Sequence, residues 1–191
     1  GPHQTKEIRE TEKVYGLKRK KLINYGYGRL DTLLQNKVNS QATNSNSKNT
    51  IIIAPSYGDN NLLEKCGIKL IDVLLKSDFR VMVRPHLRTL RDSTELIDSI
   101  TKKFGENPNF MLETGVIKFD SLNNSLCMIS DWSGISLEYA FTFERPVIFI
   151  DVPKKILNPS WSDIALEPIE TSIRDKIGHV VSPNKLEEIL E

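Results

Sequence analysis

Residues 125–152, SLCMISDWSGISLEYAFTFERPVIFIDV, decide the fold that the sequence predicts. Two short apolar runs, 126–129 and 147–150, have the composition of strands that are buried on both faces of a parallel sheet. A polar loop at 130–134 separates the first run from a helical pattern that begins at Ile135. The stretch therefore predicts a strand, a tight loop, a helix and a second strand.

The start of this predicted helix has the features of an anion-binding site. Ser133 is the expected N-cap, and Gly134 would let a ligand approach the backbone closely. A helix N-terminus presents unpaired N–H groups and the positive end of the helix dipole. Glu138 follows one turn later, where its carboxylate could accept hydrogen bonds from the two hydroxyls of a ribose. The same pattern also fits a purely structural alternative, in which Ser133 only caps the helix and Glu138 is only solvated.

The rest of the chain repeats the alternation of strand and helix. Further strands are predicted at 51–54, 79–83, 109–112 and 177–181, and the strongest helical patterns are at 61–76 and 92–104. This order predicts the α/β class, as a Rossmann-like doubly wound parallel sheet. The ligand site of such a sheet lies beyond the carboxyl ends of its strands. Three polar loops, at 55–59, 84–88 and 130–134, are therefore expected to meet at one edge.

These loops supply the remaining candidate site residues. The residues expected to line the cleft are Ser56, Tyr57, Gly58 and Asp131. The cationic candidates are Arg84, His86 and Arg88, although Arg88 also fits a solvated surface charge. Cations and backbone N–H groups can neutralise the charge that builds on a departing phosphate without a metal. His3 and His179 have no comparable setting, and no role is assigned to them.

The composition excludes several classes of protein. With 191 residues, 39% hydrophobic and 27% charged, the chain can form one compact domain, and a net charge of +1 gives no reason to expect nucleic acid as a partner. Cys66 and Cys127 lie in apolar segments and are expected to be reduced core residues. No metal and no cofactor are predicted, because the acidic residues are too scattered for a cation cage. No apolar run approaches the roughly 18 residues of a membrane span, so a cytosolic location is expected.

Three parts are expected along the chain. Residues 1–35 predict a helix near 5–15, a strand at 21–25 and a glycine turn at 26–28, all packed on the main domain. Residues 36–49 are rich in Asn, Ser and Lys and predict a flexible loop or linker, and residues 50–191 form the main domain.

Two expectations concern the ends of the chain. Residues 151–168 should be irregular, and Ser182 should cap a closing helix that runs through Leu190. The first residues, Gly1 and Pro2, could be a protease scar, so the chain is expected to be a piece of a longer protein.

The order of several motifs resembles the CDP-glycerol glycerophosphotransferase family, which polymerises teichoic acids and related cell-surface polymers. The motifs are IIIAPSYGD, VMVRPH, SDWSGISLEYAF, ERPVIFIDVPKK and, before them, YGYGRLD, which is similar to the family's G-x-P-R-x-D element. The similarity runs from about Tyr25 to Val181. It implies the C-terminal, nucleotide-binding half of a GT-B fold, in which two Rossmann-like domains face a cleft.

The resemblance also implies roles for individual residues. His86, with Arg84 and the Ser133-Gly134 loop, would hold the diphosphate of a CDP-linked donor, and Glu138 would hold its ribose. The acceptor polymer would bind through an N-terminal domain that this chain does not contain, so the chain alone would be an incomplete catalyst, and no catalytic base is assigned. The parent protein would be cytoplasmic or at the cytoplasmic face of the membrane.

Two other classes of function stay open from the residues. A different GT-B enzyme that uses a UDP-sugar, either a glycosyltransferase or a hexosamine 2-epimerase, would also place a small-residue loop and a Glu over its nucleotide. A non-enzymatic nucleotide-binding module would carry the same loops. Thermal shifts with CDP, UDP and CMP separate these classes, since a ligand stabilises the fold that it binds.

Overall fold

Six parallel strands form a single sheet in the computed structural model, which describes residues 1–39, 49–115, 118–156 and 158–191. From one edge to the other the strands are β3 (Phe110–Leu112), β2 (Arg80–Val83), β1 (Thr50–Ile53), β4 (Cys127–Ser130), β5 (Val147–Ile150) and β6 (Gly178–Val181). Every neighbouring pair is parallel. The strand order reverses between β1 and β4, which is the topological switch point of a doubly wound sheet. The predicted fold class is confirmed.

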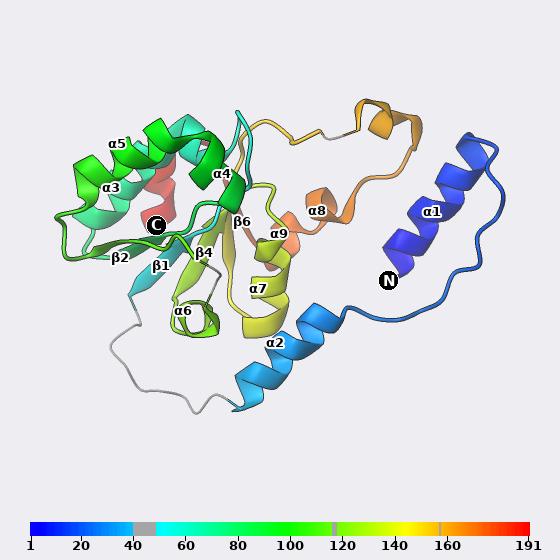
Figure 1. Ribbon diagram of the computed structural model, residues 1–191, viewed down its shortest axis with the longest axis horizontal. Coiled ribbons are helices and arrows are strands. Elements are labelled where there is room, and N and C mark those ends of the chain that lie inside the picture. The colour runs from blue at the N-terminus through cyan, green and yellow to red at the C-terminus, as the bar shows by residue number, and fades with distance from the viewer. Residues whose placement is uncertain (40–48, 116–117, 157) are drawn as a thin grey trace.

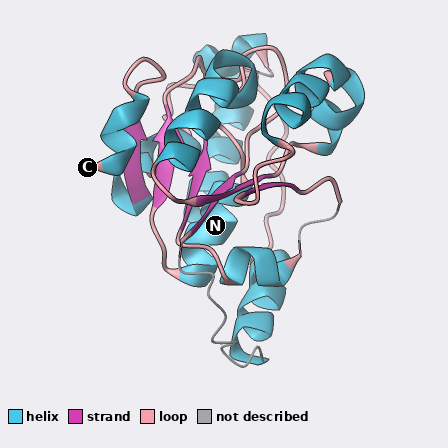
Figure 2. Cartoon of the chain, turned by 90° about the vertical axis from the view of Figure 1, so that its left-hand side faces the viewer, coloured by secondary structure: helices cyan, strands magenta, loops and turns pink. Residues whose placement is uncertain are grey.

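Helices cover both faces of the sheet (Figures 1 and 2). On one face, Ile51 and Ile53 pack in a core with α3 (Ile68–Lys76), α5 (Thr94–Phe104) and the closing 3-10 helix η3 (Leu186–Leu190). On the other face, Ile52 and Met128 pack with α6 (Phe119–Asn123) and α7 (Ile135–Phe143). Because β1 and β4 are buried on both faces, nearly every residue in them is apolar. This is the pattern by which the sequence predicted them.

Two predicted helices differ in detail from the structure. The helix predicted at 61–76 starts at Leu63 with a π-helical turn, η1 (Leu63–Gly67), before α3. Its first turn is held by Asn61, whose side-chain oxygen accepts hydrogen bonds from the N–H groups of Leu63 and Glu64. The helix predicted at 92–104 is preceded by a separate short helix, α4 (Leu87–Asp92), and the two are divided at Ser93.

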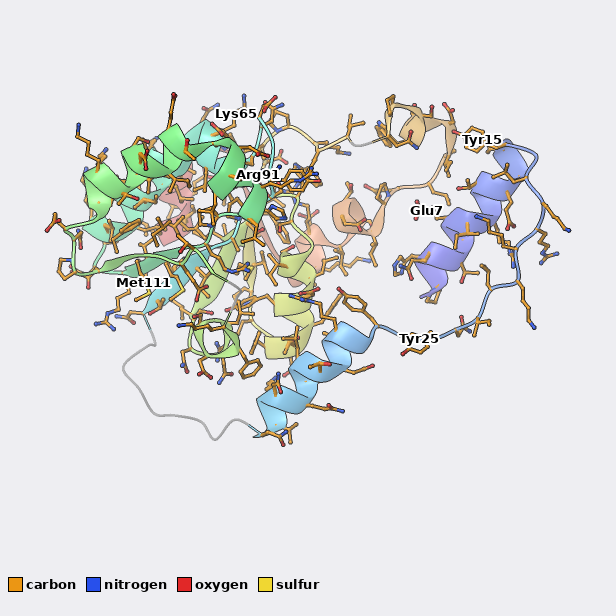
Figure 3. All side chains as sticks on the ribbon, in the orientation of Figure 1. Glu7, Tyr15, Tyr25, Lys65, Arg91 and Met111 are labelled. Atoms are coloured by element: carbon orange, nitrogen blue, oxygen red, sulfur yellow. The ribbon has the colours of Figure 1, made fainter. Side chains whose placement is uncertain are left out.

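The N-terminal part contains two helices, α1 (Pro2–Val14) and α2 (Gly28–Asn39). The strand predicted at 21–25 is wrong: this segment is extended but unpaired, and the side chain of Tyr25 is 91% exposed (Figure 3). Its β-branched and aromatic residues have no sheet edge to pack against. The loop predicted at 36–49 is also partly wrong, because 36–39 belong to α2; residues 40–48 lie outside the described residues.

The C-terminal part contains only short helices among the described residues. The segment after β5 is largely irregular, as predicted, with the 3-10 helix η2 (Pro159–Asp163) within it. Helices α8 (Ile169–Ser172) and α9 (Arg174–Ile177) lead into β6. The predicted closing helix capped by Ser182 is wrong, because only the 3-10 helix η3 forms there. The Ser182 hydroxyl instead accepts a hydrogen bond from the N–H of Asn184.

Both cysteines are free thiols in the core region. Cys127 is buried in β4, and Cys66 is partly buried in η1. Burial raises the pKa of each thiol to about 11. Neither is therefore a ready nucleophile, because the thiolate is the reactive form.

A buried carboxylate connects the loops after β1 and β4. Asp131 follows β4 directly and is 1% exposed. Its Oδ1 accepts a hydrogen bond from the backbone N–H of Ser56 (2.7 Å), and its Oδ2 accepts one from the N–H of Leu62 (2.9 Å). The Ser130 hydroxyl adds a third link, because it donates to the carbonyl oxygen of Ala54 (2.7 Å). Asp131 was expected to line the cleft; it instead supports the ligand edge from beneath.

Replacing Asp131 should destabilise the fold. Asp131→Ala leaves two buried amides without acceptors, at a cost of roughly 1–3 kcal/mol each, so we expect a loss of about 2–5 kcal/mol in the free energy of unfolding. Urea denaturation followed by circular dichroism measures this loss as a lower midpoint with an unchanged slope. The matched control is Asp98→Ala, which removes an exposed carboxylate from α5 and should change stability by less than about 0.5 kcal/mol. Equal midpoints for the two variants would show that the Asp131 bridge contributes nothing.

Candidate functional site

Three basic side chains gather around one tyrosine at the carboxyl edge of the sheet. The ring of Tyr57, in the loop after β1, lies 4.6 Å from the ring of His86 between their centroids. The guanidinium carbon of Arg88 lies 4.8 Å from the Tyr57 centroid, and Nζ of Lys155 lies 2.9 Å from it. We call these four residues the Tyr57 cluster. Tyr57, His86 and Lys155 come from the loops after β1, β2 and β5, and Arg88 from the first turn of α4, so these segments meet at one place.

His86 is held as a neutral imidazole with one free donor. It is the N-cap of α4, where its Nδ1 accepts a hydrogen bond from the N–H of Arg88 (3.0 Å). Burial lowers the pKa of His86, and the positive charges of Lys155, Arg88 and Arg84 lower it further. Because Nδ1 acts as an acceptor, the proton sits on Nε2. Among the described residues, Nε2 has no hydrogen-bond partner.

Arg84 lies between this cluster and a second group of polar residues. Its Nε is 3.6 Å from Oε2 of Glu113, too far for a good hydrogen bond, and both atoms are buried without partners within the described part of the chain. The other oxygen of Glu113 accepts a hydrogen bond from the Ser121 hydroxyl (2.9 Å). Burial lowers the pKa of Arg84, while the negative charges of Glu113 and Glu138 oppose that shift. Arg84 is thus a partly buried cation whose ion pair with Glu113 is long and poorly formed.

The N-terminus of α7 differs from the expectation in one respect. Gly134 is the N-cap, and the expected cap by the Ser133 side chain is wrong. At this helix start the carbonyl oxygen of Ser133, and not its side chain, accepts hydrogen bonds: one from the N–H and one from the hydroxyl of Ser136. In the residues that the structure describes, the N–H groups of Gly134 and Ile135 donate no hydrogen bond. They are free donors at the positive end of a helix.

Open space lies next to Gly134. Its backbone is in the ordinary right-handed helical region (φ −61°), and a Cβ placed on it would have no heavy atom within 4 Å. The fold therefore does not require glycine at this position. A ligand that approaches the free N–H groups does need the space that a side chain would fill.

Glu138 holds the glycine turn of the N-terminal part. Its Oε1 accepts a hydrogen bond from the Tyr27 hydroxyl (2.5 Å), and its Oε2 accepts one from Nε of Arg29 (2.7 Å). The hydrogen bond to Glu138 raises the pKa of both Tyr27 and Arg29. The turn requires glycine at Gly26, whose φ is +93°. Each carboxylate oxygen keeps a second lone pair, so Glu138 can accept further hydrogen bonds.

The other residues predicted to line the cleft divide into two kinds. Tyr57 is partly exposed and forms the cluster, and Gly58 is exposed with φ +104°. Ser56, like Asp131, is buried, and the hydrogen bond from its N–H to Asp131 holds the loop after β1.

Sequence reasoning missed three residues of the site. Lys155 follows the end of β5 by a few residues. Its position after a strand, at the carboxyl edge of the sheet, could have indicated a site residue. Tyr27 lies in the glycine turn and Arg29 in the first turn of α2, but nothing in the spacing indicated that they contact Glu138.

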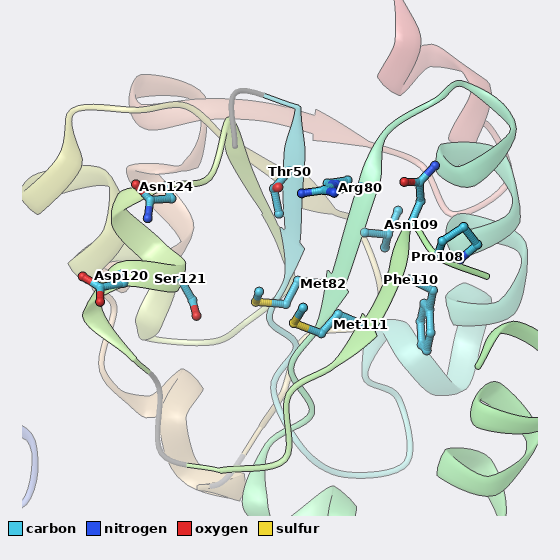
Figure 4. Close-up of a pocket in the computed structure, with 11 residues that line it drawn as sticks. Thr50, Arg80, Met82, Pro108, Asn109, Phe110, Met111, Asp120, Ser121 and Asn124 are labelled. Carbon is cyan, nitrogen blue, oxygen red and sulfur yellow. The ribbon is translucent and has the colours of Figure 1, made fainter. Parts of the chain in front are cut away.

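A separate cavity of about 400 Å³ lies on the face of β2 and β3 that α6 flanks (Figure 4). Met82 and Met111 form its floor, and Arg80, Asn109 and Asp120 lie at its margin. None of the predicted site residues lines it. It is therefore distinct from the carboxyl edge.

The described ranges of the chain contain no group of three or more His, Cys, Asp or Glu side chains that could hold a metal ion. No helix in them has the length and apolar character needed to cross a bilayer.

Solved structures with a similar fold include two of the UDP-GlcNAc 2-epimerase from Methanocaldococcus jannaschii. The structure in complex with UDP-GlcNAc and UDP superposes with a TM-score of 0.60 at 18% identity, over 92% of this chain and 49% of the epimerase. A second structure of that enzyme gives a TM-score of 0.57 at 18% identity, over 96% of this chain and 52% of the other. This chain thus spans about half the length of these enzymes, and the likeness shows the fold.

The sequence comparisons give the family. No curated protein sequence matches the chain. The model of the CDP-Glycerol:Poly(glycerophosphate) glycerophosphotransferase family matches residues 3–154, which include the glycine turn, the Tyr57 and His86 loops and all of α7. The chain belongs to this family of glycerophosphotransferases.

Proposed function

We propose that this chain is the donor-nucleotide-binding domain of a transferase that moves glycerol phosphate, or another polyol phosphate, from a CDP-activated donor to a growing cell-surface polymer. The observation that carries the proposal is the pair of free N–H groups at Gly134 and Ile135, next to open space and at the same carboxyl edge of the sheet as the Tyr57 cluster. Family membership supports the choice of a CDP-linked donor. The parent protein would work at the cytoplasmic face of the membrane.

The donor would lie across the switch point of the sheet. The diphosphate would accept hydrogen bonds from the N–H groups of Gly134 and Ile135 and from Nε2 of His86, with Arg84 and Lys155 as nearby cations. The Ser133 hydroxyl, which has no partner among the described residues, would add a donor. The ribose hydroxyls would donate to the remaining lone pairs of Glu138.

The reaction itself is the displacement of a nucleoside monophosphate. A hydroxyl oxygen of the acceptor attacks the β-phosphorus of the donor, and the bond from that phosphorus to the oxygen bridging the two phosphates breaks. CMP leaves with that oxygen, and the acceptor proton passes to a base outside the assigned residues. Fixed donors at the diphosphate stabilise the negative charge that grows on the departing CMP.

His86 should contribute to CDP affinity separately from its role in folding. His86→Asn keeps a good N-cap for α4 but removes the Nε2–H donor, so we expect CDP to bind about 10- to 150-fold more weakly, the value of one charge-assisted hydrogen bond of roughly 1.5–3 kcal/mol. Isothermal titration calorimetry measures the change. Arg91→Ala is the control, since Arg91 pairs with its neighbour Asp92 outside the cluster. An unchanged CDP affinity in His86→Asn would remove His86 from the diphosphate site.

Gly134 should be needed for binding and not for folding. Gly134→Val places a branched side chain in the open space over the two free N–H groups. Loss of two charge-assisted hydrogen bonds, roughly 3 kcal/mol or more, predicts at least about a 100-fold weaker affinity for CDP. The urea midpoint should fall only slightly. Tight CDP binding by a folded Gly134→Val variant would place the phosphates elsewhere.

Glu138 should recognise the sugar and not the phosphates. Glu138→Ala is expected to weaken cytidine and CDP by the same factor, because both carry the ribose. This substitution also removes the hydrogen bonds from Tyr27 and Arg29 to Glu138. Tyr27→Phe serves as the control, because it removes the hydrogen bond from the Tyr27 hydroxyl and keeps the Glu138 carboxylate. The ribose role fails if cytidine affinity is unaffected by Glu138→Ala, or if Tyr27→Phe weakens cytidine equally.

A panel of CDP, UDP and CMP in thermal-shift measurements tests the class of nucleotide. Selective stabilisation by CDP supports the proposed donor. Selective stabilisation by UDP would favour a UDP-sugar enzyme, and no response to any nucleotide would favour a module that does not bind nucleotides at this edge.

A further inference from the structure

A cavity of about 310 Å³ adjoins the Tyr57 cluster on the side of β5. Its walls carry the aromatic rings of Tyr57, Trp132 and Trp161 and the ammonium groups of Lys154 and Lys155. Glu170 and Thr171, from α8, also line it. The cavity is within the size range of small-molecule sites. Tyr57 and Lys155 belong both to this cavity and to the cluster, so the two are continuous.

One wall of this cavity is rigid and the other is exposed. The indole N–H of Trp132 donates a hydrogen bond to the carbonyl oxygen of Val152 (3.0 Å), and the guanidinium carbon of Arg174 lies 4.2 Å from the centre of the Trp132 rings. These contacts fix the ring. Trp161, in η2, is 40% exposed, and Nζ of Lys154 lies 5.9 Å from its centre.

The position of the cavity indicates which part of a bound donor would reach it. Glu138, the proposed ribose site, lies one turn into α7, whereas the free N–H groups of Gly134 and Ile135 lie at the start of that helix. Trp132, which lines the cavity, precedes Gly134 by two residues. A nucleotide with its ribose at Glu138 and its diphosphate at Gly134 therefore directs its diphosphate, and not its base, toward the cavity.

We propose that this cavity binds a phosphorylated polyol, either the group transferred from the donor or the end of the acceptor polymer. This assignment rests on the proposed function. The lysine ammonium groups match the phosphate charge, aromatic faces pack against the C–H surface of a polyol chain, and Glu170 and Thr171 offer acceptors for its hydroxyls. Two ammonium groups against one carboxylate favour an anionic ligand.

The double substitution Lys154→Ala with Trp161→Ala tests the proposal in the full chain. Both side chains are exposed, so the urea midpoint should stay close to that of the wild type. The control pairs Lys176→Ala with Tyr25→Ala, which removes one exposed lysine and one exposed aromatic ring away from the cavity. The probes in calorimetric titrations are CDP, CDP-glycerol and a short oligomer of glycerol phosphate.

We expect the double variant to bind CDP as the wild type does and to lose about tenfold in affinity for a polyol-bearing probe, the value of one charge-assisted contact. If CDP-glycerol loses its advantage over CDP, the cavity takes the transferred group. If the oligomer alone binds more weakly, the cavity takes the acceptor.

Other outcomes overturn the assignment. Unchanged affinities for both polyol probes, or a wild-type chain that neither prefers CDP-glycerol to CDP nor binds the oligomer, would show that no polyol site exists here. A loss of CDP affinity in the double variant would place the nucleoside in the cavity. Failure of the wild type to bind CDP would instead contradict the proposed function, and the oligomer titration would still decide the cavity.

Discussion

The loops at the carboxyl edge of the sheet depend on one buried side chain, the carboxylate of Asp131. It fixes the backbone of Ser56 and, with it, the place of the next residue, Tyr57. It also fixes Leu62 at the start of the helical segment that leads into α3. The Tyr57 ring then provides the surface against which His86 and Lys155 pack. Because carboxylate-to-amide hydrogen bonds are strong when they are buried, a single side chain sets the geometry of several loops.

Much of the fold could be predicted from the sequence, because strands that are buried on both faces must be apolar throughout. The run at 147–150 matches β5, whereas the runs at 51–54 and 126–129 are each displaced by one residue from β1 and β4; at β4 the excluded residue, Leu126, is 45% exposed. The segment 21–25 has the residue types of a strand without a sheet edge beside it, and so remains unpaired. Composition identifies a surface suited to a sheet, but not whether a partner strand exists.

The side-chain contacts of the site could not be predicted in the same way, because they join distant parts of the chain. Tyr27 and Arg29 reach Glu138 across 111 and 109 residues. Arg145, in the motif quoted for the family, donates to the carbonyl oxygens of Asn123 and Ser125 and thus supports the turn before β4. Its role is structural, although the motif gave no sign of this. Convergence of the loops followed from topology, but which side chains meet there depends on the packing of each loop.

The charges at the edge explain why its basic groups are unusual. Burial and the positive charges of Lys155, Arg88 and Arg84 lower the pKa of His86. Burial also lowers the pKa of Lys155, with a smaller effect from Arg88, while Tyr57 and Asp131 oppose that shift. Arg84 has a long ion pair with Glu113, but among the described residues no carboxylate forms an ion pair with His86, Arg88 or Lys155, and the carboxylate of Asp131 accepts hydrogen bonds from two amides. A bound diphosphate would relieve the repulsion among the cations and would also accept hydrogen bonds from the free N–H groups of Gly134 and Ile135. Under the proposed function, the cost of holding these cations together would be recovered when the diphosphate binds, and perturbed pKa values of this kind cluster at functional sites.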